Sequence, residues 1–238
     1  MSKKNNISEK QFQNTLALRK ITKLTEETKF PIKEAYKLAR TNISFSLAQE
    51  GCKFIGVTSA YQSEGKTTTV TNIALSFAQL DKRILLIDGD MRKPQVHNVF
   101  SLDNQIGLSN ILGGFAEIKD AVRKIDDKLN IITSGHIPPN PTELLSSERM
   151  KSLLIELSQD YDYIFIDTPP VNVVADTIVL CEILSGVIVV AKEGSSKHNE
   201  LGETLNKLKL SKIKVLGIIL TNSKNKSGKC RKYRDYSK

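Results

Sequence analysis

Eight consecutive residues, 60–67, bring together groups that bind phosphate. Their sequence, AYQSEGKT, fits the P-loop pattern with alanine in place of the first glycine. The segment follows an apolar run and precedes a pattern typical of a helix, which is the context that the motif requires. Backbone N–H groups at a helix start attract anions, and the helix dipole adds positive potential. We therefore expect nucleotide phosphates to bind at Ser63, Glu64, Gly65, Lys66, Thr67 and Thr68.

Two acidic loops follow apolar runs elsewhere in the chain. Asp88 and Asp90 come after the run ILLI, and Asp167 comes after YIFI. In parallel sheets, ligands bind at the carboxyl ends of strands, so these acids can meet a phosphate-bound metal. With ATP as the nucleotide, we expect Lys66 to bridge its β- and γ-phosphates. The predicted Mg²⁺ ligands are Thr67, Asp88, Asp90 and Asp167. An acid after a strand is also often only a helix cap.

The apolar runs predict an α/β fold. They are continuous and rich in β-branched residues, not alternating, which indicates strands that are buried on both faces. Helical patterns lie between them, so we expect a P-loop NTPase-like fold with a mostly parallel sheet and helices on both faces. Asn140-Pro141-Thr142-Glu143 is a helix start. Strands are predicted at 52–59, 83–87, 129–133, 164–166, 187–191 and 215–220, and helices at 33–47, 67–80, 106–112 and 115–124.

Composition and charge limit the class of protein. The chain has 238 residues and a net charge of +9, and the positive charge is concentrated at its two ends. It has no apolar run long enough to cross a bilayer, no signal-peptide pattern and no CxxC pair, so we expect a cytoplasmic protein. We expect a polar N-terminal extension at 1–29, a P-loop domain at 30–222 and a flexible basic tail at 223–238 that carries Tyr233 and Tyr236.

Three segments carry a resemblance to a known family. Residues 59–68, 84–94 (ILLIDGDMRKP) and 161–170 (YDYIFIDTPP) resemble the Walker A, A′ and B motifs of the bacterial tyrosine kinases, or BY-kinases. The similarity extends from about Pro31 to Leu220 and includes PPNPTELL at 138–145. It is closest to the cytosolic kinases of Gram-positive capsule and exopolysaccharide operons.

The resemblance implies an ATP- and Mg²⁺-dependent protein-tyrosine kinase. Its catalytic residues are then Asp88, Asp90, Lys66 and Arg92, with Asp88 as the base that deprotonates a tyrosine hydroxyl. The family has an asparagine near the adenine, four residues after the glycine of the last strand. Counting from Gly217 reaches Thr221, so we assign the contact to the next residue, Asn222.

The resemblance also implies partners. Tyr233 and Tyr236 match the family's C-terminal tyrosine cluster, which is autophosphorylated in trans within an oligomer. Glu34, Lys37 and Arg40 resemble the charged motif that joins subunits into a ring, and their spacing of three predicts one shared helix face. Further expected partners are a transmembrane polysaccharide co-polymerase or adaptor, which holds the kinase at the inner face of the membrane, and a cognate tyrosine phosphatase.

Two other functions remain open from the sequence. A switch ATPase of the partitioning and division-site type has the same fold, but its signature lysine is replaced by Tyr61 here. A nucleic-acid-associated ATPase rests only on the basic ends of the chain, and we expect no specific nucleic acid.

Overall fold

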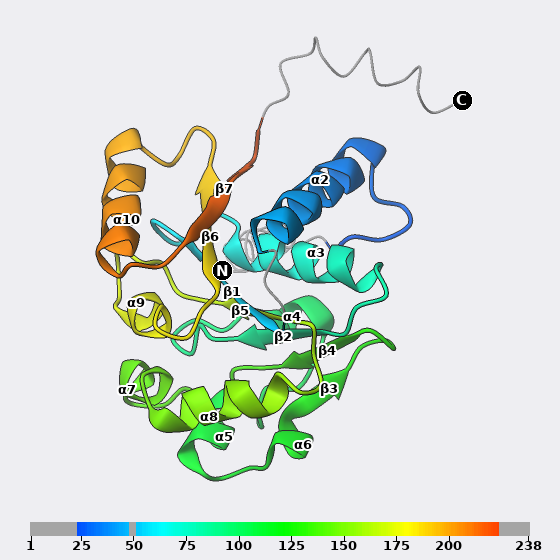
Figure 1. Cartoon of the computed structure of the whole chain (residues 1–238), viewed down its shortest axis with the longest axis vertical. Helices are drawn as coiled ribbons and strands as arrows, with labels where there is room; N and C mark the ends of the chain where they lie inside the picture. Colours follow the sequence, from blue (N-terminus) through cyan, green and yellow to red (C-terminus); the bar gives the residue numbers. More distant parts are fainter. Residues whose placement is uncertain (1–22, 48–50, 224–238) are drawn as a thin grey trace, which may run out of the picture.

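A seven-stranded sheet forms the centre of the protein (Figure 1). The computed structural model describes residues 23–47 and 51–223. The strand order is β3-β4-β2-β5-β1-β6-β7, and all neighbours are parallel except β3 and β4. This confirms the predicted mostly parallel α/β fold. The strands are β1 Lys53–Ser59, β2 Ile84–Asp88, β3 Val122–Lys124, β4 Leu129–Ile132, β5 Tyr163–Asp167, β6 Gly186–Lys192 and β7 Val215–Thr221.

Helices cover both faces of the sheet and bury two separate apolar clusters. On one face lie α2 Phe30–Ser46, α3 Lys66–Ala78 and α4 Val96–Phe100. On the other lie α5 Leu108–Gly113, α6 Ile118–Ala121, α7 Pro141–Leu145, α8 Glu148–Leu157, α9 Asp176–Leu180 and α10 His198–Leu210. Every residue of β2 is buried, as its continuous apolar sequence predicts for a strand covered on both sides. None of the helices that the structure describes is long and apolar enough to cross a membrane.

One predicted helix is wrong over most of its length. Of the residues expected to be helical at 115–124, only α6 at 118–121 is, and 122–124 form the edge strand β3. This strand pairs antiparallel with β4, so its backbone groups find partners across the sheet. β3 and β4 are consecutive strands joined by a short loop, and the pairing between them overrides local helical preference.

The ends of the chain test the predicted boundaries only in part. Residues 23–29 lie against the domain, where the Leu24 N–H donates to Asn72 Oδ1 over 2.8 Å. The ammonium of Lys23 lies 4.9 Å from the ring centroid of Phe100. Residues 1–22 and 224–238, and with them both tail tyrosines, lie outside the described residues. The boundaries at 30 and 222 stay predictions.

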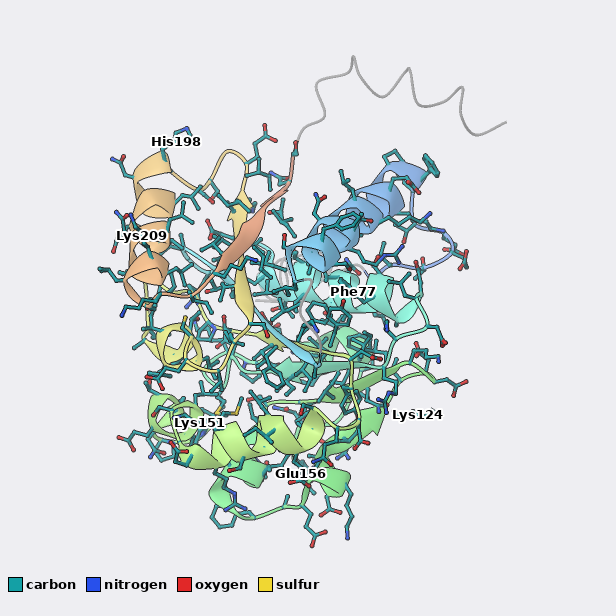
Figure 2. The ribbon with its side chains drawn as sticks, in the orientation of Figure 1. Phe77, Lys124, Lys151, Glu156, His198 and Lys209 are labelled. Atoms are coloured by element: carbon teal, nitrogen blue, oxygen red, sulfur yellow. The ribbon has the colours of Figure 1, made fainter. Side chains whose placement is uncertain are left out.

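An aromatic cluster joins α3 to the sheet. Phe77 is fully buried, and its ring centroid lies 4.6 Å from that of Tyr163 and 5.1 Å from that of Phe165 (Figure 2). Such pairs add to the free energy gained by burying the rings. Since α3 begins at the P-loop lysine, this cluster also fixes the position of the phosphate site.

We predict that Phe77→Ala lowers the free energy of unfolding by about 3–5 kcal/mol, because it leaves a cavity in a closely packed core. Phe45→Ala is the matched control, since Phe45 is 80% exposed and its removal changes stability by about 0.5 kcal/mol or less. Urea unfolding of the two variants measures both values, and equal losses would contradict the assignment of Phe77 to the core.

Candidate functional site

The P-loop has the backbone shape of an anion-binding site. It connects β1 to α3, and Gly65 and Ser63 have φ values of +95° and +65°. Successive left- and right-handed residues point their N–H groups toward a common centre, which favours a bound anion. Lys66 begins α3 and its side chain is buried beside the loop. Ser63 adopts a conformation that glycine adopts at less cost, so the loop keeps its shape without a glycine there.

Glu64 holds the P-loop in position through hydrogen bonds to neighbouring segments. Its carboxylate is buried and accepts hydrogen bonds from the Tyr61 N–H, over 3.1 Å, and from the Ser196 hydroxyl. Its carbonyl accepts a hydrogen bond of 2.7 Å from the Thr221 hydroxyl at the end of β7. The side chain of Glu64 therefore serves to position the loop, and its backbone N–H is the group that can face a phosphate.

Thr221, and not Asn222, lies against the P-loop. The Thr221 methyl group is so close to Gly65 that a Cβ atom added to this glycine would come within 3.3 Å of it. Asn222 is exposed and has a φ of +56°, and its side chain makes no hydrogen bond to the part of the chain that the structure describes. Thr221, which lies four residues after Gly217, is therefore the residue that touches the P-loop.

Three carboxylates meet at the ends of β2 and β5. The strands are adjacent, and Asp88 pairs in register with Asp167. The Thr67 hydroxyl donates to Asp167 Oδ2 over 2.6 Å, while Asp167 Oδ1 is buried and has no hydrogen-bond partner. Asp90 is buried nearby. The sheet thus brings together the four predicted metal ligands.

Asp88 also caps a helix, which is the alternative interpretation of an acid after a strand. Its Oδ2 accepts hydrogen bonds from the N–H groups of Gln95 and Val96, over 3.0 and 2.9 Å, at the start of α4. Its Oδ1 accepts only a longer bond, 3.3 Å, from the Asp90 N–H. One oxygen is therefore structural, and the other remains available for chemistry.

Burial makes these carboxyl groups poor anions in the absence of a cation. Burial raises the pKa of Asp88 well above its usual range, and the charge of Asp167 raises it further. Burial likewise raises the pKa of Asp167 to about 6, although Lys66 and the Thr67 hydroxyl lower it. The pKa of Asp90 is also raised by burial. A positive ion in this position would offset the repulsion.

The donor set fits Mg²⁺. This ion prefers oxygen ligands, and it is commonly held by one or two carboxylates with phosphates and waters completing its shell. The unpaired Asp167 Oδ1 and the Thr67 hydroxyl supply such oxygens. Among the described residues, no cluster of three His, Cys, Asp or Glu side chains could hold a metal by itself.

Arg92 connects the loop after β2 to α7 and α9. Its guanidinium donates two hydrogen bonds to the buried carboxylate of Asp176, over 2.8 and 3.1 Å, and one to the Thr142 hydroxyl, over 3.0 Å. Thr142 also donates to Asp176 over 2.5 Å. Sequence reasoning missed Asp176, because a single acid in the segment after 161–170 gives no signal of its partner. The arrangement supports Arg92 as a residue that positions the acidic loop.

The three charged residues of α2 make different contacts. Lys37 and Glu34 form an exposed ion pair of 2.8 Å. Arg40 donates to the carbonyl of Ser76 on α3. A shared face that joins subunits stays a prediction for these residues.

The fold and the site define a P-loop nucleotide-binding protein. A family model described as an AAA domain matches residues 52–218, so the chain belongs to that family. The chain is 41% identical to the tyrosine-protein kinase YwqD of Bacillus subtilis over 192 residues, 80% of this chain and 81% of that one. It is 32% identical to the tyrosine-protein kinase etk of Escherichia coli K12 over 79% of this chain, but only 26% of that longer one.

Solved structures agree with these relatives. The crystal structure of the chimerical protein CapA2B2 superimposes with a TM-score of 0.78 at 32% identity, and the match covers 89% of this chain and 97% of that one. The chain therefore belongs to the bacterial tyrosine-protein kinases, which confirms the resemblance seen in its motifs.

We predict that Gly89→Ala lowers phosphotransfer at least about tenfold, since small displacements of reacting groups have large effects on rate. A Cβ atom at this position would lie 2.8 Å from the Asp167 carbonyl oxygen and 2.9 Å from Ile166 Cγ2, so β2 and β5 must move apart. Gly217→Ala is the control, because nothing lies within 4 Å of its Cβ position. A radiolabel assay compares the two, and equal rates would contradict the requirement for close strands at the site.

Proposed function

We propose that the chain transfers the γ-phosphoryl group of ATP to tyrosine hydroxyls, chiefly those of Tyr233 and Tyr236 in its own tail. The observation that carries this proposal is the facing pair of buried carboxylates, Asp88 and Asp167, beside the P-loop threonine. A phosphate-binding loop alone would serve any nucleotide-binding protein. The acidic pair adds a place for the metal and a proton acceptor next to the transferred group.

Each residue then has a separate role. Lys66 and the P-loop N–H groups bind the β- and γ-phosphates, and Thr67 with Asp167 holds Mg²⁺, which neutralises charge that develops on the phosphates. Asp88 accepts the proton of the tyrosine hydroxyl as the phenol oxygen bonds to phosphorus and ADP leaves. A phenol has a pKa of about 10, so a proton acceptor with a raised pKa suits the step. Arg92, held by Asp176, keeps the acidic loop in place.

The tail reaches a neighbouring subunit in this proposal. We propose that phosphorylation occurs in trans within an oligomer, with the exposed Glu34–Lys37 ion pair of α2 as part of the contact. Arg40 contributes only if it leaves the Ser76 carbonyl. A monomeric mass for the purified chain at micromolar concentration would contradict this part of the proposal.

We further propose that a membrane adaptor binds this kinase at the inner face of the cytoplasmic membrane and that the pair regulates capsular or exopolysaccharide synthesis. The support is the length of the relatives, since this chain matches only 26% of the Escherichia coli kinase, whose remaining part can supply what an adaptor supplies here. A cognate phosphatase reverses the modification, and no specific nucleic acid takes part. Equal tail phosphorylation with and without the cytosolic segment of the adaptor would contradict the adaptor's role.

The switch ATPase is the less supported alternative. Tyr61 stands where that class has its signature lysine, and Tyr61 is part of the loop that Glu64 braces. The two functions differ in product, because a switch ATPase releases phosphate and a kinase retains it on tyrosine.

We predict that Tyr233→Phe combined with Tyr236→Phe removes most tyrosine labelling after incubation with Mg²⁺ and ATP, while ATP affinity is unchanged. Mass spectrometry locates the phosphate and calorimetry measures the affinity. Asp88→Asn should lower labelling much more than ATP binding, because its role lies in the transition state. Lys66→Met, which should lose both, is the reference for a site that no longer binds nucleotide. Persistent labelling of a tyrosine in the described domain, such as Tyr161, would show that the tail is not the main substrate.

We also predict that affinity for Mg²⁺ and ATP falls as pH is lowered. The pKa of Asp167 is about 6 without the ion, so protons compete with Mg²⁺ below that value. Between pH 7.5 and 5.5 this single group lowers affinity roughly fourfold, since about three quarters of it is protonated at the lower pH. Calorimetry at both values measures the change. Asp167→Asn corrects for titration of the nucleotide itself, and an equal pH dependence in this variant would exclude Asp167 as the titrating ligand.

A further inference from the structure

A hollowed surface lies between α6 and α8, on the opposite face of the sheet from α2. We call it the α6–α8 face. It contains a cavity of about 540 Å³ whose apolar side chains are Ile111, Ile118 and Leu153. Charged residues surround them, among them Arg149 and Glu156 of α8. The nucleotide site uses no residue of this face.

An exposed aromatic residue stands beside the cavity. Phe115 follows α5 and is 84% exposed, and the next residue, Ala116, lines the cavity. Gly114 has a φ of +83° and lies against the guanidinium of Arg149, so the turn holds Phe115 close to the first turn of α8. Unlike the isolated Phe45, Phe115 stands beside an apolar cavity, and burying both together removes more apolar surface from water than burying the ring alone.

The charges on α8 are divided between its two sides. Lys151 forms ion pairs with Glu148 and Glu182. Arg149 and Glu156 form no ion pair with any residue that the structure describes. They are seven residues apart, which is two helical turns, so they lie about 10 Å apart along one side of the helix. Figure 2 shows Lys151 and Glu156 on this helix.

We propose that this face binds the same face of a second copy of the chain, across a two-fold axis that makes the two α8 helices antiparallel. Arg149 of each copy then meets Glu156 of the other, and Phe115 of each copy enters the apolar cavity of the other. The face carries both halves of the ion pair and both halves of the apolar contact, which is the requirement for an isologous interface. An unrelated partner would need only one half of each.

This contact is separate from any contact that α2 makes. The two surfaces lie on opposite faces of the sheet, so both can be occupied at once. A two-fold contact joins two copies of the chain and cannot extend further. It would therefore double the number of chains in any assembly that α2 forms.

Charge reversal tests the proposal. Arg149→Glu and Glu156→Arg should each raise the dissociation constant of the dimer at least tenfold, because each places like charges opposite one another. The double variant, with Arg149→Glu and Glu156→Arg together, should restore dimerisation, since the pair is re-formed with its signs exchanged. Phe115→Ser should also weaken the dimer. Sedimentation velocity over a range of concentrations measures all four, and Lys151→Glu, on the other side of α8, is the control that should match the original chain.

Cross-linking gives an independent readout. Ser152 is exposed and lies midway between Arg149 and Glu156, so in an antiparallel pair it faces its own counterpart near the axis. Ser152→Cys should form a disulfide-linked dimer on mild oxidation beyond the level of the original chain, and Ser146→Cys, exposed at the end of α7, should not. Single reversals that leave the mass unchanged, a double variant that fails to restore it, or no excess cross-link at 152 would each overturn the proposal. So would loss of adaptor binding by Phe115→Ser without any change in mass, because the occupant is then the adaptor.

Discussion

The facing of Asp88 and Asp167 is the constraint on which the rest of the structure depends. Parallel pairing of β2 with β5 puts two carboxylates side by side in a buried position, where loss of water raises both pKa values. The charge of Asp167 raises the pKa of Asp88 further, and the charge of Asp90 raises that of Asp167. Such a pair costs stability unless a cation offsets it. Packing on both faces and the pairing of β5 with β1, which leads into the P-loop, hold the two strands together in the unsubstituted protein. The fold therefore keeps these carboxylates together at a place where a cation would offset their repulsion.

The loops around this pair are held by contacts between distant elements. Asp176 anchors Arg92 from α9, and Thr142 joins them from α7. On the P-loop side, Glu64 is bonded to Ser196 in the loop before α10, and its carbonyl to the end of β7. Removing Arg92 would be costly, since it would leave the buried carboxylate of Asp176 without its cationic partner. Loops that have no regular structure of their own thus acquire the rigidity that phosphotransfer requires.

Sequence patterns predicted the parts of the protein that depend on local rules. Continuous apolar runs identified the buried strands, and the acids predicted at strand ends lie close to the P-loop threonine in the structure. What could not be predicted depends on contacts that exist only in the folded chain. β3 pairs with the strand that follows it, Arg40 donates to a carbonyl of α3, and Thr221 donates to a carbonyl of the P-loop. Asp176 had no recognisable signal, because its importance comes only from the guanidinium that folding brings to it.

The glycine-poor P-loop shows how such distant contacts alter a local argument. Gly65 is the only glycine in residues 60–67, and a left-handed conformation costs a non-glycine residue such as Ser63 about 1–2 kcal/mol. Ser63 nevertheless has a φ of +65°, and hydrogen bonds from other segments hold the residue on each side of it. Lys93 donates to the Gln62 side chain over 2.9 Å on one side, and Thr221 holds the Glu64 carbonyl on the other. Two hydrogen bonds, at roughly 0.5–1.5 kcal/mol each, are sufficient to offset that cost. Any need for an adaptor must then arise from the nucleotide base or the tyrosine, and not from an unformed phosphate loop.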